Sequence, residues 1–123
     1  MVVIRSILGP LILMIDFLTK PNPIVREDKL QEKIDFLTSR LSLYQFKACP
    51  FCVKVRRQIR RQSLKIELRD AKNNTILKEE LKKEGGKYKV PCLRIESEMG
   101  KIEWLYESTE IIRYLRNEFS TLT

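Results

Sequence analysis

The chain has 123 residues, 43 % of them apolar, which indicates one folded domain of modest core and argues against disorder. Its net charge is +8, and it contains three cysteines and no histidine. Three cysteines are too few, and too odd in number, for a disulfide-stapled secreted scaffold. A structural zinc site needs about four Cys or His ligands, so we expect no bound metal.

Residues 1–20 form an apolar segment that ends at Lys20-Pro21-Asn22-Pro23. The apolar run from Val2 to Leu18 is at the lower limit for crossing a bilayer, and Asp16 is costly within it. No small-residue cleavage site follows, so a secretory signal peptide fits poorly. Three interpretations remain open: an interfacial or marginally spanning membrane anchor, a helix that covers an apolar patch of the domain, or a dimer contact. We therefore predict a cytoplasmic protein; under the first interpretation, residues 1–20 associate with the inner face of a membrane.

Residues 25–40 have the pattern of a connecting helix. Leu30, Ile34, Leu37 and Leu41 recur at helical spacing, which marks one apolar stripe. The expected organisation is a hydrophobic segment plus this helix over residues 1–40, followed by a main domain over residues 41–123.

The main domain has alternating strand and helix patterns. Residues 41–46 suit a strand, and the helix that follows them lacks breakers. Gly85-Gly86 is a natural helix end, and residues 98–100 suit the turn of a hairpin. The order is β-α-β-α-β-β-α, with the expected strands at 41–46, 65–70, 91–96 and 102–106 and the expected helices at 50–62, 75–84 and 108–119.

Cys49-Pro50-Phe51-Cys52 stands where the first strand gives way to a basic helix. A cysteine at a helix N-terminus has its thiolate stabilised by unsatisfied N–H groups and the helix dipole. This layout predicts a thiol–disulfide exchange site in which Cys49 is exposed and attacks, and Cys52 points toward the core and resolves. The alternative is that both cysteines are inert packing residues.

The helix after Cys49 is strongly basic. Between Lys47 and Arg61 there are six basic residues and no acidic one. Such a run is often only a solvated face, and the functional alternatives are attraction of anionic thiols, of nucleic acid or of an anionic membrane. No aromatic platform or recognised motif accompanies it, so we expect no nucleic-acid partner.

Three separated motifs resemble those of the glutaredoxin family, which has the thioredoxin fold. They are Cys49-Pro50-Phe51-Cys52, similar to the family's CPYC; Val90-Pro91, which matches its TVP segment; and the stretch from Tyr106 to Ile112, similar to its glutathione-binding turn. The Glu107-Ser108 pair in this turn is most similar to the corresponding pair in the N-terminal domain of glutathione transferases. The resemblance covers about residues 41–119 and implies a thioredoxin-like α/β fold with a four-stranded mixed sheet.

The resemblance also implies a glutathione site. Val90-Pro91 would be a cis peptide whose exposed Val90 backbone pairs with a peptide-like ligand, although a proline that starts a strand is the ordinary interpretation. Glu107 and Ser108 would receive the γ-glutamyl carboxylate at a helix N-terminus. Ser108 could also serve as the helix N-cap, and the two roles are compatible.

Several residues depart from the family pattern. Phe46 stands where the family commonly has a lysine, so a contact of Lys47 with the glycine carboxylate of glutathione is less direct. Phe51 replaces the usual tyrosine, and Lys89 replaces a threonine and could add a carboxylate contact. Cys92 is either a small core residue or a partner for an alternative disulfide with Cys49.

The resemblance implies a glutaredoxin: a thiol–disulfide oxidoreductase that uses glutathione as co-substrate to reduce protein disulfides and glutathionylated proteins. Cys49 and Cys52 would be catalytic. One alternative is a glutathione-coordinated iron–sulfur cluster carrier, against which the proline after Cys49 argues, because cluster-binding relatives usually have glycine there. A second is a non-catalytic membrane- or partner-binding module. A glutathione transferase is the third, but the chain lacks room for that family's helical C-terminal domain.

Overall fold

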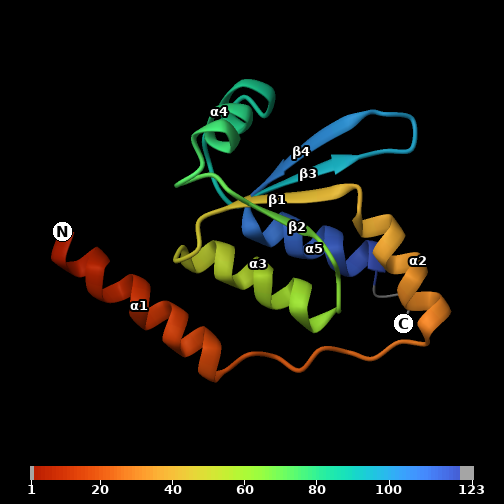
Figure 1. Ribbon diagram of the computed structural model, residues 1–123, viewed down its shortest axis with the longest axis horizontal. Coiled ribbons are helices and arrows are strands. Elements are labelled where there is room, and N and C mark those ends of the chain that lie inside the picture. Colours follow the sequence, from red (N-terminus) through yellow and green to blue (C-terminus); the bar gives the residue numbers. More distant parts are fainter. Residues whose placement is uncertain (1, 120–123) are drawn as a thin grey trace.

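The computed structural model describes residues 2–119, and the side chains of residues 9–119. Within these residues the elements follow the expected order after two N-terminal helices (Figure 1). They are α1 (Val2–Leu18), α2 (Asp28–Thr38), β1 (Leu41–Gln45), α3 (Pro50–Arg61), β2 (Glu67–Asp70), α4 (Thr75–Glu84), β3 (Cys92–Glu96), β4 (Ile102–Tyr106) and α5 (Ser108–Phe119).

The four strands form one mixed sheet in the order β2-β1-β3-β4. β1 is parallel to β2 and antiparallel to β3, and β3 and β4 form a hairpin. Figure 1 shows α3 and α5 on one face of the sheet and α4 on the other. The predicted thioredoxin-like α/β fold with a four-stranded mixed sheet is confirmed.

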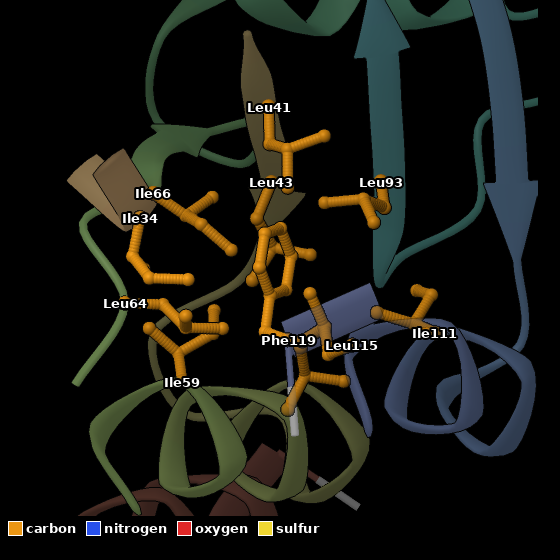
Figure 2. Packing of buried hydrophobic residues seen from close by; sticks show 11 residues of the cluster. Ile34, Leu41, Leu43, Ile59, Leu64, Ile66, Leu93, Ile111, Leu115 and Phe119 are labelled. Atoms are coloured by element: carbon orange, nitrogen blue, oxygen red, sulfur yellow. The ribbon is translucent and has the colours of Figure 1, made fainter. Parts of the chain in front are cut away.

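Two hydrophobic clusters hold these layers together, because successive side chains of a strand point to opposite faces. Leu41 and Leu43 of β1 pack toward α3 and α5, where Figure 2 shows them with Leu93, Leu115 and their neighbours. Tyr44 packs on the opposite face in a second core cluster, defined as Tyr44, Ala71, Leu81 and Cys92. All five residues of β1 are buried, as a central strand covered on both faces requires.

Two elements begin two or more residues later than the sequence predicted. α2 begins at Asp28 and not near residue 25, because the backbone of Ile24 hydrogen-bonds to Arg61 and Ser63 and is held outside the helix. β2 begins at Glu67 and not at Lys65, since its ladder with β1 starts at the Ser42–Glu67 pair. α2 nevertheless belongs to the main core, because Ile34 is fully buried in it. The division into residues 1–40 and 41–123 stays a prediction.

The apolar segment at the start of the chain is the helix α1, which continues through Pro10. In the described part of the chain, no helix has both the length and the apolar character that a bilayer crossing requires. Several apolar side chains of α1 are exposed: Leu11, Met14, Ile15, Phe17 and Leu18. Membrane association through residues 1–20 and the location in the cell stay predictions.

Candidate active site

The three motifs of the sequence lie at one end of the sheet. Strand pairing places Tyr44 opposite Cys92, and Cys92 opposite Tyr106. These residues mark the end of β1, the start of β3 and the end of β4. The cysteine motif follows the first of these points, Val90-Pro91 precedes the second, and Glu107 follows the third. Segments more than 50 residues apart in the chain are thus brought to the same edge.

Cys49 is the N-cap residue of α3. Its backbone is extended, its carbonyl accepts the first helical hydrogen bond from the N–H of Val53 at 2.9 Å, and Pro50 occupies the first turn. Its side chain is half-buried and makes no capping hydrogen bond. The first-turn N–H groups of an α-helix have no partner within the helix, so they and the helix dipole favour an anion at this end. The local geometry therefore suits a thiolate at Cys49.

Cys52 differs sharply from Cys49, because its side chain is fully buried. The backbone N–H of Phe46 donates to its sulfur at 3.4 Å. Burial raises the pKa of Cys52 to about 12, and the neighbouring Cys49 sulfur adds to this, against the opposing effect of the Phe46 hydrogen bond. Cys52 is therefore a protonated thiol at neutral pH, while Cys49 is the accessible member of the pair.

Arg56 fixes the loop before Cys49, a role that the sequence analysis missed. Its guanidinium donates to the side chain of Gln45 and to the carbonyls of Phe46 and Lys47, at 3.3 and 2.5 Å for the two carbonyls. Arg56 lies seven residues after Cys49, two helical turns along the same face. This spacing was the available signal, but nothing in the sequence set Arg56 apart from the other basic residues of α3.

The Val90-Pro91 peptide is cis, as the family resemblance implied. Lys89, just before it, forms an ion pair with Glu107, which lies just before α5. The hydrogen bond and charge of Lys89 hold the pKa of Glu107 below its ordinary value. Val90 and Phe46 both pack against the second core cluster, which joins this group to the cysteine loop.

The N-cap position of α5 is occupied by Glu107 and not by Ser108. The carbonyl of Glu107 accepts from the N–H of Ile111 at 3.0 Å, and Glu107 has a φ of 71°, outside the helical region. Ser108 is the first helical residue and is buried. The interpretation of Ser108 as the N-cap is therefore wrong, because the chain turns into the helix one residue earlier.

The remaining predicted residues are near the cysteines in different ways. Phe51 is exposed on the first turn of α3, and Lys47 is exposed in the loop before it. Phe46 packs its ring on Tyr88, with ring centroids 5.9 Å apart, while its backbone holds Cys52. A phenylalanine in the family's lysine position thus has a structural role, and the loop cation is Lys47 instead.

Cys92 is completely buried in the second core cluster. Burial raises the pKa of its thiol to about 11, opposed by a hydrogen bond with Tyr106. These surroundings support its interpretation as a small core residue. An alternative disulfide with Cys49 stays an untested prediction.

The two buried thiols should make the reduced protein less stable at alkaline pH. In the unfolded chain a cysteine ionises near pH 8.5, whereas Cys52 and Cys92 in the folded chain stay protonated to about pH 12 and 11. The unfolded state then loses protons first, so their contribution is complete below about pH 8.5 and is lost as the pH rises through the folded pKa values. Each thiol contributes at most about 1.4 kcal/mol per pH unit.

Urea unfolding of the reduced protein between pH 7 and 10 measures this slope. The double variant Cys52→Ala/Cys92→Ala should show a flatter dependence than the wild type. Equal slopes of unfolding free energy against pH in the two proteins would contradict the assignment of this effect to Cys52 and Cys92.

No group of three or more His, Cys, Asp or Glu side chains is placed to hold a metal ion within the residues that the structure describes.

Comparison with known proteins adds to this geometry. The family model of the glutathione S-transferase N-terminal domain matches residues 43–121, which include the second half of β1, the later strands and all three motifs. The chain belongs to this family. The glutathione S-transferase N-terminal domain family thus accounts for the second half of β1 and all the elements after it, while α1 and α2 precede the matched residues.

Among solved structures, the chain is similar to that of a mutant of the alkylhydroperoxide reductase protein AhpF from Enterococcus faecalis (V583). The two are 28 % identical, with a TM-score of 0.41, and the match covers 75 % of this chain and 45 % of that one. The chain therefore spans less than half the length of that structure. A search of the curated proteins found no match. The family match and the strand order together place the chain among proteins with a thioredoxin-like fold.

Proposed function

We propose that the protein is a glutathione-dependent thiol–disulfide oxidoreductase of glutaredoxin type. The observation that carries the proposal is the asymmetry between its two thiols. Cys49 is accessible at the start of α3, whereas Cys52 is fully buried with a pKa raised to about 12. A thiol–disulfide exchange site needs this difference in accessibility. The accessible cysteine attacks as the thiolate, and the buried cysteine stays protonated until it resolves the mixed disulfide.

The reaction consists of two thiol–disulfide exchanges, and each conserves the number of electrons. The Cys49 thiolate attacks the glutathione sulfur of a protein–glutathione mixed disulfide; a bond forms between these two sulfurs, and the protein thiolate leaves and takes up a proton. A second glutathione thiolate then attacks, releases glutathione disulfide and regenerates Cys49. With an ordinary protein disulfide as substrate, Cys52 attacks the mixed disulfide at Cys49, so the two cysteines end oxidised and the substrate reduced.

The end of the sheet that holds the cysteines offers groups suited to glutathione, which carries two carboxylates and a peptide backbone. The first-turn N–H groups of α5 lack helical partners and suit a carboxylate. Next to them, a pocket of ≈ 340 Å³ lined by Ser108 also contains three cationic side chains, Lys54, Arg113 and Arg116. The name of the matched family adds support for this ligand. The residues that we propose to hold glutathione are Lys47, Phe51, Lys89, Val90, Pro91, Glu107 and Ser108.

The test is the reduction of a glutathionylated peptide by the wild-type protein, with glutathione or an equal concentration of cysteine as the reductant. We expect saturable dependence on glutathione and a rate at least about tenfold above that with cysteine, because only glutathione gains the contacts of a built site. Equal rates with both thiols would refute the glutathione site.

Absence of turnover in a folded protein would refute the enzyme. A brown protein with cluster absorbance after anaerobic purification would then favour the iron–sulfur carrier.

A further inference from the structure

The N-terminal helix α1 forms one wall of a pocket at Cys49. The pocket has a volume of ≈ 430 Å³, and its lining combines α1, the loop before α3 and Cys49 itself. The lining residues are Gly9, Ile12, Phe46, Ala48, Cys49, Pro50 and Lys72. None of the residues that we propose to hold glutathione is among them. The accessible Cys49 thiol therefore lies between the proposed glutathione site and this separate pocket walled by α1.

α1 lies close against the cysteine loop. Figure 1 shows the middle of α1 passing beside the loop that precedes α3. A methyl group placed on Gly9 would lie 3.4 Å from Cβ of Ala48, which is van der Waals contact, so α1 and the loop lie close together at this point. Ile12, one turn later, is half-buried, whereas Ile15 on the same helix is exposed.

The basic helix α3 holds α1 in this place. Arg57 donates to the carboxylate of Asp16 at 3.1 Å and to the hydroxyl and carbonyl of Thr19 at 3.1 and 2.8 Å. Arg60 donates to the carbonyl of Pro21 at 3.0 Å. The Asp16 side chain is 15 % exposed, so its charge pairs with Arg57 and is largely withdrawn from water. Asp16, an unfavourable residue in an apolar run, thus serves as the attachment point of that run.

The pocket chemistry favours an apolar ligand group. Five of its seven lining residues are glycine, alanine, proline, isoleucine and phenylalanine, and the only charged one is Lys72. Its volume fits a side-chain-sized group beside a sulfur atom, since drug-sized pockets span about 300–1,000 Å³. Burial of an aliphatic or aromatic group in this pocket removes apolar surface from water, which favours binding.

We propose that α1 is a specificity element of the active site: the pocket between α1 and Cys49 takes an apolar group on the half of a mixed disulfide that departs as the thiol. This inference rests on the proposed function for its reaction, but the pocket itself is testable without turnover. The apolar group can belong to a small organic thiol or to the residue beside a cysteine in a peptide, because both present the same surface.

The experiment compares the full-length variants Ile12→Asn and Ile15→Asn, which make the same change at a half-buried position in the pocket wall and at an exposed position of the same helix. The substrates are mixed disulfides of glutathione with benzyl mercaptan and with 2-mercaptoethanol. We expect Ile12→Asn to lower kcat/KM about tenfold for the benzyl substrate, because one apolar contact is lost, and to leave the hydroxyethyl substrate within about twofold. Ile15→Asn should change neither. Peptides glutathionylated beside leucine or serine then distinguish the peptide source from the small thiol.

A second measurement separates this proposal from the proposed function. The rate of Cys49 alkylation by N-benzyl iodoacetamide, divided by the rate with iodoacetamide, reports the pocket with no glutathione present. A fall of this ratio in Ile12→Asn alone supports the pocket, even if the protein shows no turnover. An unchanged ratio in Ile12→Asn, or an equal fall in Ile15→Asn, overturns it whether or not turnover occurs. If Ile12→Asn does not fold, Ile12→Ala removes the same apolar surface without adding a polar group.

Discussion

Replacement of Cys49 with serine should abolish glutathione-coupled reduction, whereas replacement of Cys52 should preserve the reduction of glutathionylated peptides. Cys49 is the accessible thiol at the N-terminus of α3, and a serine hydroxyl there stays protonated and is a poor nucleophile. The reaction with a glutathione mixed disulfide needs only Cys49 and a second glutathione. Cys52→Ser should therefore retain a rate within roughly tenfold of the wild type.

The same variants should distinguish the reduction of glutathionylated peptides from the reduction of protein disulfides. Reduction of an intramolecular protein disulfide requires Cys52 to release the substrate, so Cys52→Ser should accumulate a covalent complex that intact-mass spectrometry detects. Cys92→Ala is the matched control, because it removes a third, buried thiol to which the proposed reaction assigns no role. Loss of both activities in Cys52→Ser, with the fold intact by circular dichroism, would contradict the assigned roles. So would full activity of Cys49→Ser.

Leu43→Ala should lower the free energy of unfolding by roughly 2–5 kcal/mol, the range for a fully buried leucine whose removal leaves a cavity. Leu43 is completely buried at the centre of β1, where it packs against the helices that cover that face (Figure 2). Since α3 and α5 are packed on this strand face, the surrounding side chains can collapse only partly into the space.

The chain provides a matched control in Leu68. It is the register partner of Leu43 on the adjacent parallel strand, yet it is 47 % exposed because β2 is the edge strand of the sheet. Leu68→Ala should cost less than about 1 kcal/mol, as expected for a residue that loses little buried surface. Urea unfolding of both variants measures the difference. A similar loss of unfolding free energy in Leu43→Ala and Leu68→Ala would show that α3 and α5 do not bury Leu43 as described.

Much of the fold could be predicted from local pattern. The alternation of strand residues, the absence of breakers after Cys52 and the turn residues at Gly85-Gly86 and Met99-Gly100 placed every element of the main domain within about two residues. Local pattern was least informative where the chain is held by distant partners. The start of α2 depends on hydrogen bonds between Ile24 and the end of α3, and nothing near residue 24 signals them.

Neighbouring residues and their spacing were enough to establish the cysteine pair, its place at a strand-to-helix junction and the order of the elements. The set of side chains around Cys49 depends instead on contacts between distant parts of the chain. Strand pairing brought Val90-Pro91 and Glu107 to the same end of the sheet as the cysteines. Arg57 and Asp16, 41 residues apart, placed α1 beside the thiol. Such contacts are selected by packing and by pairing of buried charge over long distances in the chain, and no local pattern encodes them.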